Sequence, residues 1–438
     1  MIKQGRFMMV KKAVSAIILS FIFFNVSIGQ TDTTSERISD FVSYPFINFY
    51  ADTLITEYDS SLLTHFFNKW DKIVKTKEGN LNIIHIGGSH VQAGTFPHTI
   101  RQQILLKNPD LIGERGLIFP YSAAPKSNNP IDYRVRSIGS FSIVRNVFTP
   151  HEVPLGLTGV AVITEDTLAE LRIIFTDSLL KFETEELILM GYSDSSYIVP
   201  TIWIDSLEYF PTKIDTIKKR FYYESLHFTD SFTVRFNCSQ GERFITNGFY
   251  LKNSKPGITY HSIGVNGAAL PSFLRCENFE QDLDLIYPDL VIMGIGVNDA
   301  SGPNFDPEEF KNNYLVLIEK FQKVNPECAF IFVTNNDTYK RVRRKKKVYW
   351  TNNVNGKKVQ QVMYELASIT QGAVFDQYHI MGGAKSMYQW MQKGLAQRDR
   401  VHFTRKGYQL MGMLFHDALM ESKIRLDNYN TNKDNSEL

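Results

Sequence analysis

The chain has 438 residues, of which 43% are hydrophobic and 21% are charged. This balance is typical of a globular protein with a full core and excludes a largely disordered chain. The 48 basic and 46 acidic residues nearly cancel, so no excess of positive charge points to a nucleic-acid partner. The length fits one large domain or two of moderate size.

Residues 1–29 have the pattern of a secretory signal peptide. They carry four basic and no acidic residues, an apolar run over 13–24, and a small residue, Gly29, before the expected cleavage at Gln30. The alternative is an uncleaved anchor, but the run is shorter than the roughly 20 residues of a spanning helix. Removing the segment leaves 44 basic against 46 acidic residues. We therefore expect an exported protein, in the periplasm, at the cell surface or secreted.

Hydrophobic periodicity predicts alternating helices and strands in most of the chain. Helical spacing predicts a helix over 61–74, and the apolar run 81–87 predicts a buried strand that ends in glycines. A helix over about 95–107 follows. Later come strands over 290–295, 329–334 and 373–376 and helices over 307–324, 356–369 and 406–420. The polar residues 427–438 are expected to form a frayed tail.

Residues 121–259 have a different pattern. Short alternating runs rich in Val, Ile, Phe, Tyr and Thr are separated by turn residues, which is typical of an all-β module. We therefore predict an α/β domain, formed by residues 30–120 and 260–426 and interrupted by an inserted β-sandwich. Alternating strands and helices predict a mostly parallel sheet covered on both faces. Ligands of such sheets bind at the carboxyl ends of the strands.

Four short blocks follow predicted strands or lie near the C-terminus, and each has a structural alternative. In Gly87-Gly88-Ser89-His90 a serine is displayed between a strand and a helix, whose first N–H groups would face a developing oxyanion; the alternative is a simple helix cap. In 264–268 (GVNGA) glycines would let the backbone approach a reacting carbonyl; the alternative is a turn at the domain junction.

The other two blocks supply a side-chain amide and an Asp–His pair. In 296–299 (GVND) the Asn298 amide can donate to an oxyanion, although these residues also favour plain turns. In 399–402 (DRVH) Asp399 can fold back onto the imidazole of His402 and fix its tautomer. The alternative is a surface aspartate beside a core or capping histidine.

Together and in this order, the four blocks resemble the SGNH (GDSL-like) hydrolase family. That resemblance implies a flavodoxin-like three-layer fold, with Ser89 as nucleophile, His402 as base and Asp399 as its partner. It further implies an oxyanion hole formed by the N–H groups of Ser89 and Gly267 and by the side chain of Asn298. The family has aspartate where this chain has Gly88, which removes hydrogen bonds that hold the serine loop and could weaken turnover.

The layout, with a long β insertion between the serine and glycine blocks, resembles that of bacterial peptidoglycan and cell-wall polysaccharide O-acetylesterases. In those enzymes the insertion resembles a carbohydrate-binding jelly roll. The resemblance implies removal of acetyl groups from a cell-envelope glycan, with that glycan as the partner. The alternatives are an O-acetyltransferase with the same residues, assisted by a membrane O-acyltransferase, and a catalytically weak glycan-binding protein. Aromatic residues that could stack on sugars are Trp203, Tyr209, Tyr222, Tyr223, Tyr388 and Trp390.

We expect no cofactor and no metal. The three cysteines, Cys238, Cys276 and Cys328, are far apart and form no C-x-x-C pair. His85, His90 and His98 lie near the serine without a carboxylate at ligand spacing. The basic run 340–347 (KRVRRKKK) is expected to be a solvated loop or helix face at the rim of the site. The alternative is contact with an anionic wall polymer or a membrane surface.

Overall fold

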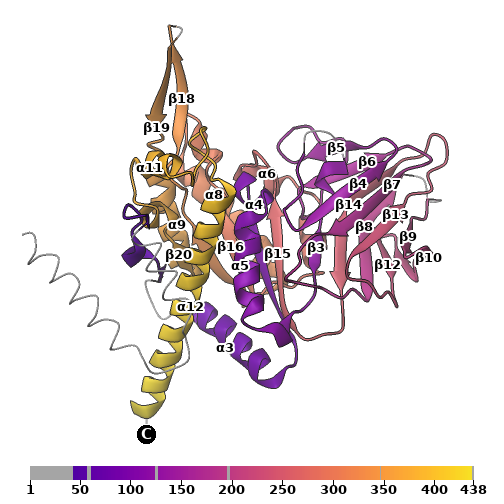
Figure 1. Ribbon diagram of the computed structural model, residues 1–438, viewed down its shortest axis with the longest axis horizontal. Helices are drawn as coiled ribbons and strands as arrows, with labels where there is room; N and C mark the ends of the chain where they lie inside the picture. Colours follow the sequence, from indigo (N-terminus) through magenta and orange to yellow (C-terminus); the bar gives the residue numbers. More distant parts are fainter. Residues whose placement is uncertain (1–42, 57–60, 124–126, 195–197, 346, 437–438) are drawn as a thin grey trace, which may run out of the picture. The chain divides into compact units, whose positions relative to one another are not determined.

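This protein contains sheets of two kinds, one mostly parallel and the others antiparallel (Figure 1). A computed structural model describes residues 43–56, 61–123, 127–194, 198–345 and 347–436. The chain divides after Ile47, and the unit from Asn48 onward is described by itself. The predicted signal peptide lies outside these residues. Within the described ranges, no helix combines the length and the apolar character needed to span a bilayer.

A six-stranded, mostly parallel sheet carries the site. Its order is β1 (Leu54–Ile55), β20 (Ala373–Phe375), β17 (Ala329–Val333), β16 (Leu290–Gly294), β2 (Asn80–Gly87) and β15 (Gly257–Gly264). Only β1 is antiparallel to its neighbour, β20. Strand β2 lies between β15 and β16, and Gly87 at its carboxyl end is in register with Gly264 and Gly294.

Helices cover both faces of this sheet. One group comprises α3 (Ser61–Thr76), α5 (Thr95–Leu106) and α12 (Arg405–Ser436), and the other α6 (Leu270–Leu274), α7 (Phe279–Leu283), α8 (Pro307–Val324) and α9 (Gly356–Thr370). Side chains of β2 alternate between them: the His85 ring lies 5.2 Å from that of Phe96 on α5, while Ile84 and Ile86 join the core beside α8. Short helices are α4 (Ser89–Gln92), α10 (Gln377–Ile380), α11 (Ser386–Gln392), η1 (Phe49–Ala51), η2 (Pro109–Leu111), η3 (Tyr121–Ala123) and η4 (Asp299–Ser301).

Between α5 and β15 the chain forms two antiparallel sheets. The first has the order β10 (Leu207–Tyr209), β9 (Thr201–Ile204), β13 (Ser231–Arg235), β7 (Glu170–Phe175) and β4 (Tyr133–Ile138). The second has the order β11 (Lys213–Asp215), β12 (Arg220–Tyr223), β8 (Glu186–Ser193), β14 (Phe244–Lys252), β6 (Val160–Thr164) and β5 (Ser142–Arg145), with β3 (Gly116–Ile118) also paired to β14. Phenylalanines join the two sheets, for example Phe232 of β13 and Phe249 of β14, with ring centroids 5.6 Å apart.

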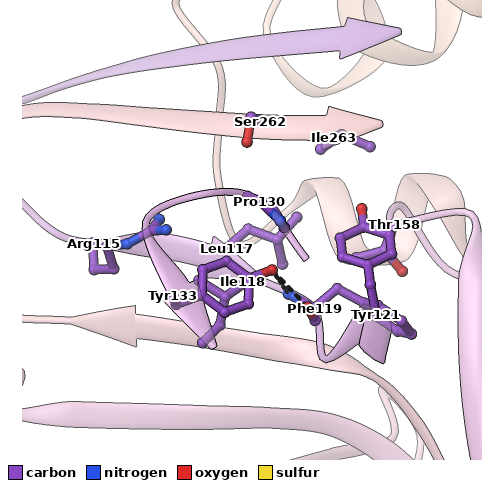
Figure 2. A pocket seen from close by; sticks show the side chains of 10 residues that line it. All are labelled: Arg115, Leu117, Ile118, Phe119, Tyr121, Pro130, Tyr133, Thr158, Ser262 and Ile263. Atoms are coloured by element: carbon purple, nitrogen blue, oxygen red, sulfur yellow. Dashed lines mark hydrogen bonds between the residues drawn. The ribbon is translucent and has the colours of Figure 1, made fainter. Parts of the chain in front are cut away.

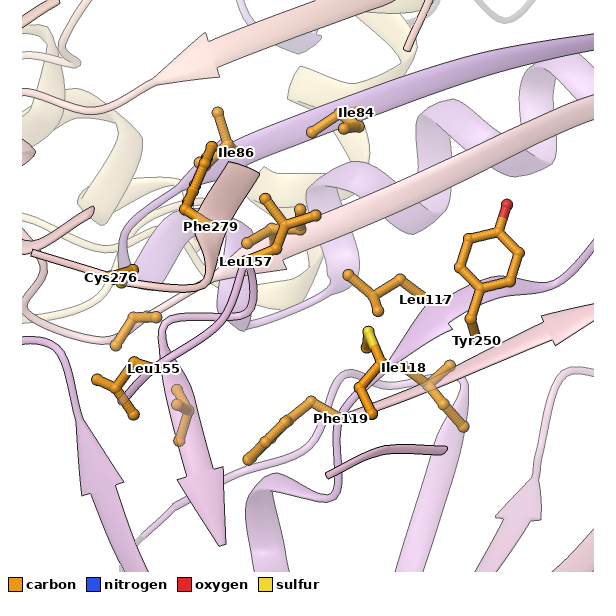
Figure 3. Close-up of a cluster of buried hydrophobic side chains, with 14 of the residues drawn as sticks. Ile84, Ile86, Leu117, Ile118, Phe119, Leu155, Leu157, Tyr250, Cys276 and Phe279 are labelled. Atoms are coloured by element: carbon orange, nitrogen blue, oxygen red, sulfur yellow. The ribbon is translucent and has the colours of Figure 1, made fainter. Parts of the chain in front are cut away.

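A continuous hydrophobic core links the antiparallel sheets to the parallel one (Figure 3). It runs from Ile84 and Ile86 of β2 through Leu117 of β3 to Tyr250 of β14. A buried ion cluster adds to this junction, because Arg101 of α5 and Arg115 both donate to the carboxylate of Asp132. Burial alone would raise the pKa of Asp132, but the two guanidinium groups hold it well below its usual range.

Two segments differ from the sequence predictions. The last helix, α12, runs on to Ser436 instead of ending at 420, because no glycine or proline follows Gly412 to stop it. The basic run 340–347 is neither a loop nor a helix face. It lies in a hairpin of β18 (Tyr339–Arg344) and β19 (Lys347–Asn352), which projects beyond the helices in Figure 1.

Candidate active site

Ser89 lies directly beyond the carboxyl end of β2, on the turn into α4. The turn is tight because Gly87 leaves no room for a side chain: a Cβ there would lie 2.5 Å from the side chain of Val91 and 2.9 Å from the carbonyl oxygen of Gly294. The carbonyl of Gly88 accepts from the N–H groups of Val91 and Gln92 at 3.1 and 3.0 Å. The glycines thus present the serine hydroxyl at the sheet edge.

Ser89, His402 and Asp399 form one hydrogen-bonded chain. The hydroxyl of Ser89 lies 2.7 Å from Nε2 of His402, and Nδ1 of His402 lies 2.7 Å from Oδ2 of Asp399. The second carboxylate oxygen accepts from the backbone N–H groups of Val401 and His402 at 2.9 and 3.0 Å. With Nδ1 donating to the carboxylate, Nε2 is left to accept the serine proton.

The environment of Asp399 favours its ionised form. Partial burial would raise its pKa, but the hydrogen bonds from the side chain and backbone of His402 and from the backbone of Val401 outweigh that effect and hold the pKa below its ordinary value. An anion at this position stabilises the positive imidazole that forms when His402 takes a proton.

Three hydrogen-bond donors of the predicted oxyanion hole lie around Ser89. Its own N–H is the first of α4, so no earlier helical turn can accept it. The N–H of Gly267, a residue with φ of +83°, has no acceptor within the described part of the chain. The amide of Asn298 donates to the carbonyl of Ala268 at 2.9 Å, which orients the group and leaves its second N–H free.

Three residues that the sequence reasoning missed hold this loop in place. Gln92, buried on α4, accepts from the N–H of Asn266 at 2.6 Å. Arg145, at the end of β5, donates to the carbonyl of the same Asn266 at 2.6 Å. Asp299 accepts from the N–H of Leu270 at 2.9 Å, and burial raises its pKa to about 6 despite that bond. Gln92 and Asp299 lie in the short motifs S-H-V-Q and G-V-N-D, whereas Arg145 lies in none.

Gly88, which replaces the family's aspartate, faces the oxyanion donors. A Cβ at this position would lie 3.3 Å from Nδ2 of Asn298 and 3.6 Å from the carbonyl oxygen of Ala268. The serine loop has other supports, since Gln92 also donates to the carbonyl of Asn128 at 3.1 Å. The lost carboxylate therefore does not leave the loop without hydrogen bonds.

A groove with a volume of about 380 Å³ opens over Ser89. Its lining includes Gly267, Asn298 and His402 from the parallel-sheet part and Asn128 from the segment before β4. Figure 2 shows a different cavity, between β3 and β15, where Tyr133 donates to the carbonyl of Phe119 at 2.6 Å. Its volume of about 10 Å³ is no more than one water needs, so it cannot hold a substrate.

The aromatic residues expected to stack on sugars divide into two kinds. Tyr223 and Trp390 are core residues, completely buried and hydrogen-bonded to backbone carbonyls. Trp203 and Tyr222 are partly exposed, but cations lie over their rings, Arg235 at 3.9 Å and Lys213 at 5.1 Å respectively. Tyr209 is half-buried and Tyr388 is 41% exposed. None of the six lines the groove over Ser89.

The neighbouring histidines have structural contacts. His85 bonds to the hydroxyl of Tyr260 at 2.9 Å, and His90 to that of Tyr408 at 2.8 Å. Burial lowers the pKa of each to about 3, so both are neutral near pH 7. His98 bonds to Arg101. In the described ranges, no group of three or more His, Cys, Asp or Glu side chains is placed to bind a metal ion. The three cysteines are free and buried.

Comparison with solved structures shows the fold. A peptidoglycan O-acetylesterase matches with a TM-score of 0.69 and 20% identity, over 85% of this chain and 99% of that chain. So large a share must include part of residues 121–259. The lipase/acylhydrolase from Enterococcus faecalis (23% identity, TM-score 0.28) covers 39% of this chain and 77% of its own. A family two carbohydrate esterase from Cellvibrio japonicus matches with 10% identity and a TM-score of 0.26. That match covers 66% of this chain and 98% of the esterase chain. No curated protein matches.

A family model matches the later part of the chain. Residues 230–410 match the GDSL-like Lipase/Acylhydrolase family. The range includes Gly267, Asn298, Asp399 and His402, while the position of Ser89 in the site rests on its hydrogen bond to His402. Residues 230–410 therefore form a GDSL-like acylhydrolase domain, the domain of an SGNH-type esterase.

Proposed function

We propose that this protein is a serine esterase that removes acetyl or other short acyl groups from a cell-envelope polysaccharide such as peptidoglycan. The observation that carries the proposal is the unbroken hydrogen-bonded chain of Ser89, His402 and Asp399 beneath an open groove. The fold in common with a peptidoglycan O-acetylesterase supports the choice of substrate. On this proposal residues 121–259 form a jelly-roll-like module that helps to hold the glycan.

The proposed reaction has two steps. Nε2 of His402 takes the proton of Ser89 as its hydroxyl oxygen attacks the ester carbonyl, and Asp399 stabilises the imidazolium. The N–H groups of Ser89 and Gly267 and the amide of Asn298 stabilise the oxyanion. Its collapse breaks the ester bond, and the alkoxide leaves with the proton from His402. Water then attacks the acyl-serine with His402 again as base, which releases the carboxylic acid and restores Ser89.

A weakly active binding protein is the less favoured alternative. Separation of Ser89, His402 and Asp399 beyond hydrogen-bond reach would favour that alternative, whereas both contacts measure 2.7 Å. An acetyltransferase would use the same acyl-serine and differ only in the acceptor, so the two activities are distinguished by product. We propose further that the chain is exported and cleaved before Gln30, which N-terminal sequencing of the protein made by its native host tests.

The decisive experiment measures acetate release from p-nitrophenyl acetate and from O-acetylated peptidoglycan. The mature protein is compared with Ser89→Ala and with Ser142→Ala, a control at an exposed position of β5. Loss of the nucleophile should lower kcat by roughly 10⁴-fold or more, with an unchanged melting temperature, while the control keeps full activity. Equal rates for the mature protein and Ser89→Ala would refute the proposal. Acetyl transfer to added glycan without free acetate would favour the transferase.

A further inference from the structure

The basic hairpin, residues 339–352, carries a dense cluster of positive charge. Seven of the eight residues 340–347 are lysine or arginine, and the sequence has no acidic residue between Asp337 and Glu365. Arg341, Arg343 and Lys347 are exposed. Among the described residues, none of these three side chains has a carboxylate partner. Their charge is thus available to a partner outside the chain.

This concentration of charge does not serve the fold. Like charges close together on paired strands repel one another and destabilise a hairpin. In this hairpin Arg344 lies opposite Lys347, a pair of like charges, while Arg341 and Arg343 lie opposite Trp350 and Val348. Val348 and Tyr349 are 42% and 48% exposed, so the outer part of the hairpin packs against little else. A binding role would account for a charge pattern that folding does not require.

The base of the hairpin is joined to the catalytic turn. The N–H of Tyr339 donates to the carbonyl of Arg400 at 3.1 Å, and Arg400 lies between Asp399 and His402 in sequence. The guanidinium of Arg400 lies over three rings, those of Tyr339 at 5.4 Å, Trp350 at 4.9 Å and Tyr388 at 5.1 Å. Such contacts fix a cation against aromatic faces. The hairpin therefore starts at the rim of the active site and is anchored there.

A second contact ties the hairpin to another loop near the site. The ammonium group of Lys340 lies 3.5 Å from the carbonyl of Gly302, in the loop that follows Asn298. Six-residue strands extend roughly 20 Å from this base. A polymer bound with an ester at Ser89 could thus pass over the rim and meet Arg341, Arg343 and Lys347 several sugar units away.

We propose that the basic hairpin binds the carboxylates of an anionic glycan polymer while Ser89 attacks an ester on the same polymer. The proposal rests on the proposed function and deepens it, since it makes the substrate a polyanion. Guanidinium and ammonium groups pair with carboxylates, arginine often through two parallel hydrogen bonds. The hairpin's position at the groove rim favours a polymer that occupies both sites over a membrane, which would need no connection to the catalytic turn.

The test compares two triple variants with the mature protein. The neutral-hairpin variant is Arg341→Gln/Arg343→Gln/Lys347→Gln, and the control removes three exposed charges from α3 and the end of α5, as Lys72→Gln/Lys75→Gln/Lys107→Gln. Substrates are O-acetylated peptidoglycan chains, the same chains with amidated carboxylates, and p-nitrophenyl acetate, which is too small to reach the hairpin.

We expect the neutral-hairpin variant to raise KM for the anionic chains roughly tenfold with kcat unchanged, because exposed ion pairs contribute modestly but add up. The control should match the mature protein, and amidated chains and p-nitrophenyl acetate should not distinguish the proteins. The KM of the mature protein should also rise with salt. Equal KM values on anionic chains for all three proteins would overturn the inference.

Binding separates this inference from the proposed function. The assay measures how much protein pellets with insoluble peptidoglycan. It compares Ser89→Ala with Ser89→Ala that also carries the three hairpin substitutions, so it measures binding without turnover. If the neutral-hairpin protein no longer pellets with peptidoglycan, the inference is supported, whether or not the mature protein hydrolyses p-nitrophenyl acetate. Failure to hydrolyse p-nitrophenyl acetate would count against the proposed esterase activity only. If the substitutions instead abolish binding to phosphatidylglycerol vesicles and leave peptidoglycan binding intact, the hairpin is a membrane contact and the inference is wrong.

Discussion

Arg145, a cation of the antiparallel sheet, contacts the loop that carries the proposed oxyanion donor Gly267. Its guanidinium donates at 2.6 Å to the carbonyl of Asn266, and the N–H of that same peptide group belongs to Gly267. A hydrogen bond to a carbonyl polarises the amide and strengthens its N–H as a donor. Replacing Arg145 with methionine removes both this polarisation and a positional constraint on Gly267, whose φ of +83° marks a special backbone conformation.

The size of the effect follows from two limits. Losing an oxyanion donor outright costs about 10²- to 10³-fold in kcat. Polarisation by one neighbouring bond changes hydrogen-bond strength by roughly 10–30%, which alone is worth only a few-fold. Added misplacement of the Gly267 N–H brings the expected loss for Arg145→Met to about tenfold in kcat, with KM unchanged, because Arg145 is not among the residues that line the groove.

Steady-state kinetics with p-nitrophenyl acetate measure this loss. Arg145→Lys, which keeps a cationic donor, should recover part of kcat, and Arg136→Met at an exposed position of β4 should have no effect. Melting temperatures show whether the fold is intact. A normal kcat in a folded Arg145→Met protein would refute the reasoning, and a raised KM with normal kcat would mean that Arg145 contacts the substrate instead.

Three other changes test the site and its support. Asn298→Ala should lower kcat by about 10²- to 10³-fold with little change in KM. Gly264→Ala should destabilise the fold by about 1–3 kcal/mol or more, because its Cβ would lie 2.2 Å from the backbone N of Gln92; Gly356→Ala, with nothing within 4 Å, is the control in thermal melts. Asp299, with a pKa raised to about 6, holds an extra proton in the folded state between about pH 4 and 6, so stability falls as pH rises through that window. Asp299→Asn should remove this pH dependence of stability, which amounts to about 3 kcal/mol over the window. Urea unfolding at several pH values measures it.

Each of these has an outcome that would contradict it. Unchanged kcat in Asn298→Ala would remove that amide from the oxyanion hole. Equal melting temperatures for the Gly264 and Gly356 variants would mean that the strand end can open to admit a methyl group. Parallel stability profiles against pH for Asp299→Asn and the unmodified protein would place the titration on another group.

The site residues that could be proposed from the sequence are those that lie in short motifs. Ser89, Asp399 and His402 were proposed together because each stands in a short block that resembles a family motif. The structure places these three residues in hydrogen-bond contact. The roles of Arg145 and Gln92 could not be proposed, since they depend on which strand end comes to lie beside Asn266. No local pattern in the sequence encodes that position.

The basic hairpin shows a similar limit in the fold. The lysines and arginines between 340 and 347 interrupt the hydrophobic pattern, so the pattern predicts no strand there. The β-forming residues are Val342 and 348–351. The contact that favours the hairpin is made with Arg400, far along the chain. Strands 81–87 and 329–334, in contrast, were predictable as apolar runs because the parallel sheet buries both of their faces.

The order of the strands sets when activity can arise during folding. Neighbouring strands β2 and β15 are separated in sequence by both antiparallel sheets, and Ser89 meets a histidine 313 positions away. Such long loops close slowly, since their entropy must be overcome before any contact forms. Partly folded chains and C-terminal truncations that lack residue 402 should therefore have no esterase activity. The recovery of turnover after dilution from denaturant would then report the last step of folding, later than the return of secondary structure.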